Sequence, residues 1–95
     1  MMESKELELQ KIRKDLKEMI ARELALEDIK PEEIGDDEVL FGEGLGLDSL
    51  DAVEIVVLLQ RNFGVEIKNM DQGKEIFYSI NTIANFIYDH QVKAA

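Results

Sequence analysis

The sequence predicts an all-α fold: a small four-helix bundle of three principal helices plus one short helix, with a long loop between the first two. Three segments carry apolar residues at steps of three and four, the spacing of a helix with one buried face. Aspartate or serine precedes two of these segments, where its side chain can cap a helix N-terminus. The chain has 95 residues, 45% of them hydrophobic, which predicts a single domain over residues 1–95 with one modest core.

The first helix is predicted over residues 4–24. Charged residues of both signs fill the faces between its apolar positions, which favours a solvated surface over a membrane-binding or partner-binding strip. The apolar positions are Leu9, Ile12, Leu16, Met19, Ile20 and Leu24.

Residues 25–48 are predicted to form the long loop. Apolar residues are scattered through it, which predicts a loop pinned to the core rather than a disordered linker. Pro31 to Ile34 can form one helical turn with proline at its first position. The glycines at 42, 44 and 46 do not indicate a nucleotide-binding loop, because no strand precedes them and no lysine follows them. The acidic residues of the loop lack the spacing of an EF-hand.

The second helix is predicted over residues 49–62. Asp48 is its expected N-cap, and Asp51, three residues on, is the acidic half of a capping-box-like pair. One apolar stripe is predicted to face the core, and a second line lies about 100° away beside Asp51 and Glu54. The second line either docks partners or packs under the long loop. The core stripe is Ala52, Ile55, Val56, Leu59 and Phe63, and the second line is Leu50, Val53 and Val57.

The rest of the chain predicts a short helix over residues 71–78 and a last helix over 80–90. Gly73 weakens the short helix, since glycine costs about 1 kcal/mol relative to alanine within a helix. Ser79 is a suitable N-cap for the last helix, whose buried face carries Ile80, Ile83, Ala84 and Ile87. His90, the only histidine, falls at the fraying end and is not expected to be catalytic.

Ser49 is the candidate functional residue, in the first turn of the second helix. Free amides and the positive end of the helix dipole would favour a phosphate ester on its hydroxyl. A nucleophilic serine needs a neighbouring base, and none is evident nearby in the sequence. Ser49 is therefore predicted to be modified by an enzyme rather than to act as one.

The segment Leu45-Gly46-Leu47-Asp48-Ser49-Leu50-Asp51, followed by Val53-Glu54 and by Phe63-Gly64-Val65-Glu66-Ile67, resembles the acyl carrier protein family. The resemblance extends from about residue 9 to residue 87. It implies a 4'-phosphopantetheine arm on the serine of Asp48-Ser49-Leu50, and acyl intermediates held on it as thioesters for enzymes of fatty acid, polyketide or related lipid biosynthesis. It also implies that Leu50, Asp51, Val53, Glu54 and Val57 contact partner enzymes, and that the chain itself catalyses nothing. Gln60-Arg61-Asn62 stands where the family commonly has acidic residues, which suggests dedicated partners.

Composition sets the remaining expectations. There are 11 basic and 21 acidic residues, a net charge of -10, which argues against nucleic acid and anionic membranes and for partners with basic patches. Such partners include a phosphopantetheinyl transferase and acyl-transferring and acyl-modifying enzymes. Without cysteine there is no disulfide or thiolate metal site, and no metal is expected. No spanning segment or signal peptide is evident, so we expect a cytoplasmic monomer.

Two alternatives stay open at this stage. The cargo could be aminoacyl, D-alanyl or peptidyl. The chain could instead be a helical adaptor without a prosthetic group, in which Ser49 is an ordinary first-turn residue.

Overall fold

The computed structural model describes residues 4–24, 29–42, 44–67, 73 and 75–94. Its elements in chain order are α1 (Ser4–Glu23), η1 (Pro31–Glu33), α2 (Ser49–Phe63) and α4 (Ile80–Ala94). The described residues form no strand, only an isolated bridge, and the all-α prediction is confirmed. Of the predicted short helix at 71–78, Gly73, Glu75 and Ile76 are helical, whereas residues 71, 72 and 74 lie outside the described residues.

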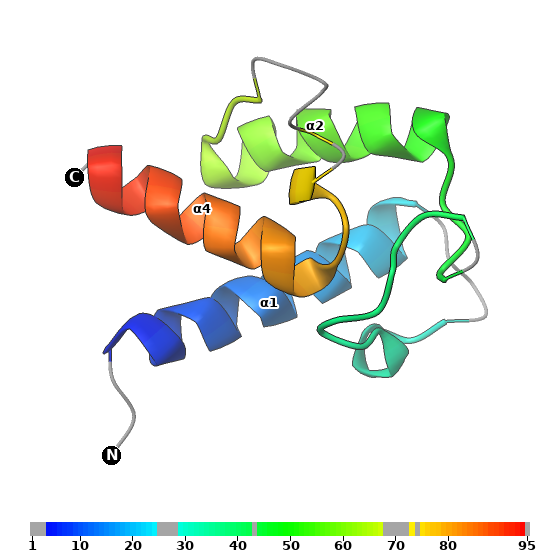
Figure 1. The fold of residues 1–95 in the computed structure, drawn as a ribbon, viewed down its shortest axis with the longest axis horizontal. Helices are drawn as coiled ribbons and strands as arrows, with labels where there is room; N and C mark the ends of the chain where they lie inside the picture. Colours follow the sequence, from blue (N-terminus) through cyan, green and yellow to red (C-terminus); the bar gives the residue numbers. More distant parts are fainter. Residues whose placement is uncertain (1–3, 25–28, 43, 68–72, 74, 95) are drawn as a thin grey trace.

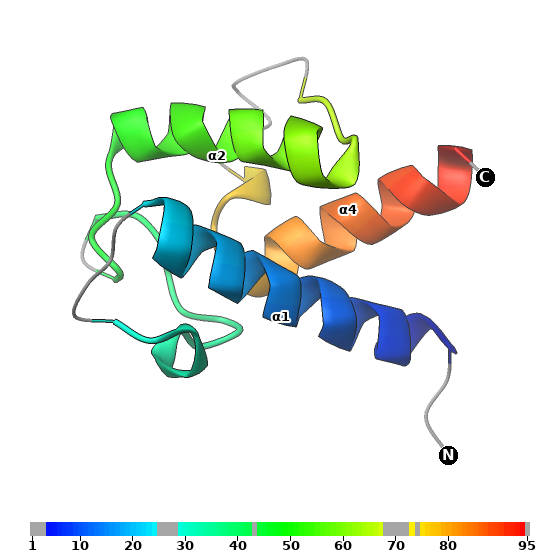
Figure 2. The ribbon, with the colours of Figure 1, turned by 180° about the vertical axis from the view of Figure 1, so that it is seen from behind.

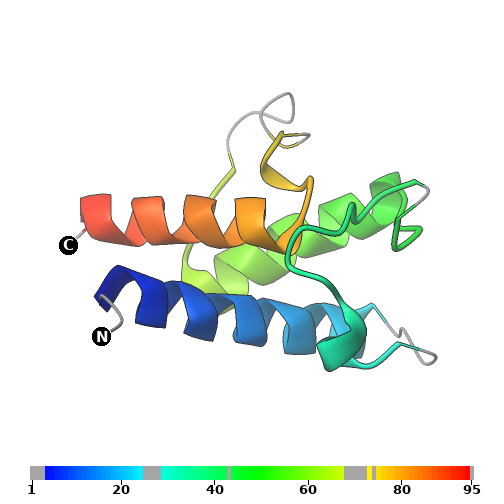
Figure 3. The ribbon, with the colours of Figure 1, turned by 60° about the horizontal axis from the view of Figure 1, so that its bottom comes forward.

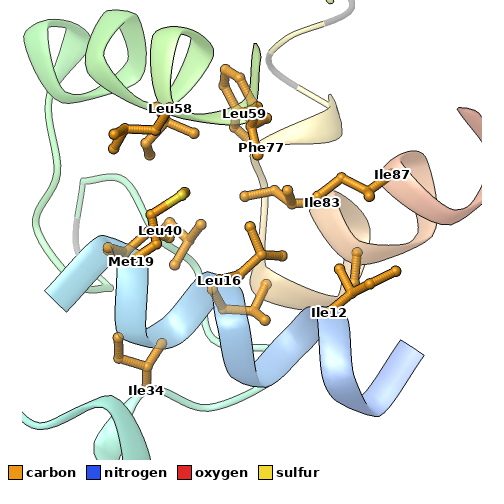
Figure 4. Packing of buried hydrophobic residues seen from close by; sticks show 14 of the residues in the cluster. Ile12, Leu16, Met19, Ile34, Leu40, Leu58, Leu59, Phe77, Ile83 and Ile87 are labelled. Carbon is orange, nitrogen blue, oxygen red and sulfur yellow. The ribbon is translucent and has the colours of Figure 1, made fainter. Parts of the chain in front are cut away.

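The three long helices lie side by side with α1 antiparallel to both α2 and α4 (Figure 1). The view from behind shows the same arrangement with α1 in front (Figure 2). The start of α1 and the end of α4 lie at one end of the bundle, and the start of α2 lies at the other. Apolar side chains from all three helices and from the long loop point towards one another between them (Figure 4).

α1 has the predicted start at Ser4 and ends at Glu23, one residue before the predicted end. Five of its six predicted core positions are buried, and the sixth, Leu24, is half-buried. The buried five are Leu9, Ile12, Leu16, Met19 and Ile20.

α2 is turned slightly differently from the prediction. Its fully buried residues are Ile55, Leu58 and Leu59, and Leu58 was not among the predicted core positions. Phe63, predicted to lie in the core, is only half-buried and packs against the edge of the core. Helical geometry accounts for both differences: the buried face is centred near Ile55, with Leu58 on one side of it and Phe63 farther out on the other. Gly64 ends the helix as a left-handed C-cap.

α4 begins after Ser79, as predicted. The Thr82 amide donates to Ser79 Oγ at 3.2 Å, and the Ser79 amide donates to Thr82 Oγ1 at 2.9 Å, which is a reciprocal cap. The four predicted core positions, Ile80, Ile83, Ala84 and Ile87, are all buried. The predicted end at residue 90 is wrong: the helix continues to Ala94, because the apolar period that marked the helix stops before its hydrogen bonding does.

The long loop is pinned to the bundle as predicted. Ile34, Leu40 and Leu47 are buried, and Pro31–Glu33 forms the predicted helical turn with proline at its start. Leu26, another of the scattered apolar residues expected to pin this loop, lies outside the described residues.

The middle of this loop runs beside α1 and the start of α4 (Figure 3), and polar contacts hold it there. Asp36 pairs with Lys17 Nζ at 2.6 Å, and Arg13 Nε lies 3.9 Å from the same carboxylate. Asn81, near the start of α4, donates from its backbone N–H to the Asp36 carbonyl oxygen and from its side-chain Nδ2 to Asp37 Oδ1. Part of the charge on α1 therefore orders the loop instead of facing solvent.

Candidate functional site

The approach to Ser49 is a hydrogen-bonded loop rather than a loose one. The Leu47 amide donates to the Leu40 carbonyl at 3.1 Å, and the Leu40 amide donates to the Tyr78 carbonyl at 3.0 Å. Leu40 and Leu47 are both buried, and Phe41 forms a parallel bridge with Leu47. Because Leu47 lies two residues before Ser49, these contacts fix where α2 begins.

Two glycines allow the loop to fold this tightly. A Cβ on Gly44 would lie 1.7 Å from the Val39 carbonyl oxygen, which real Cβ atoms do not tolerate. That same oxygen accepts from the Leu45 amide at 2.9 Å. Gly46 has a φ of +88°, which disfavours residues with a side chain. Gly44 and Gly46 are therefore required by the backbone of this loop.

Asp48 and Asp51 form the predicted capping box at the start of α2. Asp48 Oδ1 accepts from the Leu50 amide at 3.0 Å and from the Asp51 amide at 3.2 Å. Asp51 Oδ2 accepts from the Asp48 amide at 2.9 Å. The helix N-terminus is therefore largely satisfied by the chain's own carboxylates. This corrects the expectation that free amides here would attract a phosphate, because two of those amides already donate to Asp48.

Ser49, the first residue of α2, is exposed. Its hydroxyl has no hydrogen-bond partner among the described residues. Asp48, held by its own hydrogen bonds, precedes it, and the exposed Leu50 follows it. The arrangement presents a hydroxyl group on a fixed backbone, open to an enzyme that approaches from solvent.

The second apolar line of α2 faces solvent, as one of the two predicted alternatives required. Leu50 is 78% exposed, Val53 56% and Val57 41%. Glu54 is exposed beside this line, and Asp51 is half-buried by its role in the cap. We call the line of Leu50, Val53 and Val57 the α2 strip. An exposed apolar strip with an acidic border, starting next to Ser49, has the composition of a protein-docking surface.

The comparisons with known proteins agree with these features. A family model described as "Phosphopantetheine attachment site" matches residues 14–87. The chain is 36% identical over 73 residues to the acyl carrier protein of Wolinella succinogenes, covering 77% of this chain and 88% of that protein. It is 40% identical over 62 residues to the acyl carrier protein of Sulfurovum sp. (strain NBC37-1), covering 65% of this chain and 76% of that protein.

The chain belongs to the acyl carrier protein family. The cofactor that this family attaches is 4'-phosphopantetheine, as predicted. The residues around Ser49 fit such a group, because the hydroxyl is exposed and its neighbours leave it without a competing hydrogen bond.

His90 lies on α4, towards the end of the bundle opposite to the start of α2, and its ring is tilted against that of Phe86 with the centroids 6.3 Å apart. Among the described residues, no group of three or more His, Cys, Asp or Glu side chains is placed to hold a metal ion. In the same residues, no helix is long and apolar enough to cross a membrane.

Sequence reasoning missed two features that bear on the site. The contacts of Asp36 with Lys17 and Arg13 join positions that are far apart in the chain, and no local sequence pattern indicates these contacts. Arg61 was noticed only as a departure from the family, although helical geometry places it on the same face as the α2 strip.

Proposed function

We propose that this chain is an acyl carrier protein whose 4'-phosphopantetheine arm is attached to Ser49, and that it presents acyl intermediates to enzymes of fatty acid, polyketide or related lipid biosynthesis. The observation that carries the proposal is the exposed Ser49 hydroxyl, without a partner among the described residues, at the capped start of α2. This position falls inside the segment that the attachment-site family matches.

Each neighbouring group has a defined part in presenting Ser49. Leu47 anchors the backbone two residues before it, and the capping box holds the first turn of α2 in place. A phosphopantetheinyl transferase would supply the base that takes the hydroxyl proton, since the described neighbours of Ser49 offer carboxylates already engaged as caps. When bound, the arm supplies the thiol on which acyl groups are carried as thioesters.

The α2 strip and its acidic border support docking of partner enzymes. Leu50, Val53 and Val57 would supply apolar contact area, and Asp51 and Glu54 would attract a basic patch and speed association. Since the cargo is tethered, its effective concentration at a docked enzyme's active site can reach the millimolar range. The chain would act as a carrier and not as a catalyst, as a monomer in the cytoplasm.

The alternatives differ in how the findings bear on them. Both relatives are acyl carrier proteins, which favours an acyl cargo over aminoacyl, D-alanyl or peptidyl units. The match to the attachment-site family favours a carrier over the helical adaptor without a prosthetic group. Intact mass of the protein purified from its native source would identify the cargo.

The test of the attachment site is arm transfer to purified protein, followed by intact mass. Incubation with a phosphopantetheinyl transferase and coenzyme A should add one phosphopantetheine to the wild type and none to Ser49→Ala. Ser4→Ala is the matched control, because Ser4 is also exposed at the start of a helix. This substitution should leave arm transfer unchanged. Ser49→Ala should change the free energy of unfolding by less than about 1 kcal/mol, since Asp48 is the cap. Full modification of Ser49→Ala would place the attachment site elsewhere.

A further inference from the structure

The exposed face of α2 does not end at Val57. At 100° per residue, Arg61 lies eleven residues after Leu50 and only about 20° from it around the helix axis. It is also about 40° from Val57 by the same geometry. Arg61 is exposed, so the face of α2 that carries the α2 strip continues past Val57 to a cation in the last turn of the helix.

Arg61 has no ion pair or hydrogen bond among the described residues. Three other cations of the chain form ion pairs: Arg13 pairs with Glu6, Lys17 with Asp36, and Arg22 with Glu23. A basic residue in the last turn of a helix stabilises it through the dipole by about 0.3–1 kcal/mol, which is the simplest role for Arg61. Any exposed position in that turn would serve the dipole equally, however, and this one continues the strip.

The strip is short enough to be covered by one partner. Ser49 and Arg61 are twelve residues apart, or about 18 Å along the helix. A standard interface buries about 800 Å² on each partner, a patch roughly 30 Å across. An enzyme surface that reaches Ser49 and covers Leu50, Val53 and Val57 therefore extends to Arg61. Covering a charge with a partner surface that offers no opposing group is costly, so we expect a carboxylate on the partner opposite Arg61.

We propose that Arg61 is a specificity-determining residue for docking, and that the phosphopantetheinyl transferase acting on this chain carries cations opposite Asp51 and Glu54 and a carboxylate opposite Arg61. The inference rests on the proposed attachment at Ser49 and adds the charge pattern of the partner. The opposite charges at the two ends of the strip fix the direction in which α2 docks. They also disfavour enzymes whose docking surface is basic along its whole length.

The test is the rate of arm transfer by the phosphopantetheinyl transferase of the same organism, measured as kcat/KM with coenzyme A. Arg61→Gln should lower kcat/KM several-fold, and Arg61→Glu should lower it about tenfold or more at low ionic strength. The loss should shrink as salt is added, because the affected interaction is between charges at an accessible interface. Lys11→Glu is the matched control, because Lys11 is exposed on α1 and its replacement changes the net charge by the same amount. The kcat/KM of this variant should stay within about twofold of the wild-type value.

Thermal melts of the same variants separate docking from the helix dipole. Arg61→Glu should remain folded at the assay temperature, with a small fall in Tm at most. A fall in Tm with kcat/KM equal to that of Lys11→Glu would show a role in helix stability alone and overturn the proposal. Faster transfer to Arg61→Glu than to wild type would overturn it too, since the opposing surface would then be basic. Failure of wild type to accept the arm would instead refute attachment at Ser49, and this inference with it.

Discussion

Two neighbouring residues of α2, Leu58 and Val57, should differ strongly in how much stability their truncation removes. Leu58 is 3% exposed and Val57 is 41% exposed, although they are adjacent in the chain. Leu58→Ala deletes three buried carbons at about 0.8 kcal/mol each and leaves a cavity, so the free energy of unfolding should fall by about 3 kcal/mol. For a domain of this size that corresponds to a fall in Tm of roughly 12–24 °C.

Val57→Ala should have little effect on stability. It removes two carbons that are partly solvated, a loss of about 1 kcal/mol, and gains about 0.5 kcal/mol because alanine has the higher helix propensity. The net change should be about 0.5 kcal/mol, while arm transfer to Ser49 falls because the α2 strip loses contact area.

Denaturant unfolding of both variants, run beside the arm-transfer assay, tests this assignment. A large destabilisation of Val57→Ala together with a small one of Leu58→Ala would mean that α2 is rotated and that its docking face must be redrawn. Phe63→Ala gives an intermediate reference point. Its ring is half-buried, so it should cost less than the 3–5 kcal/mol typical of a fully buried phenylalanine.

Three further predictions concern the loop and the acidic border. Gly44→Ala should lower the free energy of unfolding by about 2–4 kcal/mol, through overpacking and the loss of one hydrogen bond. Gly35→Ala is the control: its Cβ would meet its nearest atom at 3.4 Å, so it should leave the free energy of unfolding unchanged or raise it by up to about 1 kcal/mol. Equal denaturation midpoints for the two variants would contradict the close approach at Gly44. Asp36→Asn should cost about 0.5 kcal/mol at low salt and less at high salt, because its carboxylate is half-exposed; a loss independent of salt would exclude the ion pairs as its cause. Glu54→Lys should slow arm transfer several-fold at low salt without changing Tm. It tests docking more directly than Asp51→Lys, which also breaks the capping box. Transfer to Glu54→Lys at the wild-type rate would argue against docking on this acidic border.

The parts of the fold that were predictable from sequence are those with local causes. Helical period identified the core faces of α1 and α4, and the caps Asp48 and Ser79 were evident because each bonds within three residues of itself. The exposure of Val57 was not fixed by the sequence, which left its apolar line either docking partners or packing under the long loop; the structure shows that the side chain is 41% exposed.

The remaining features depend on contacts between distant segments. The need for glycine at position 44 comes from its packing on the Val39 carbonyl, and no sequence pattern indicates that approach. The depth of Leu58 and Phe63 depends on how α2 is rotated against α1 and α4, which periodicity fixes only to within about one residue, or 100°. Ser49 lies exposed in the first turn of α2, as the sequence predicted, while the hydrogen-bonded loop that precedes it was not foreseen.

The placement of the helix ends has a practical consequence for attaching this protein to other molecules. The start of α1 at Ser4 and the end of α4 at Ala94 lie together, whereas Ser49 opens α2 at the far end of the bundle. A linker, a fused domain or a solid support joined through either of those helix ends would stand about one bundle length away from the serine. Several copies could therefore be fused in tandem or attached to a surface, each with its Ser49 hydroxyl pointing away from the attachment point and accessible to the same soluble enzyme.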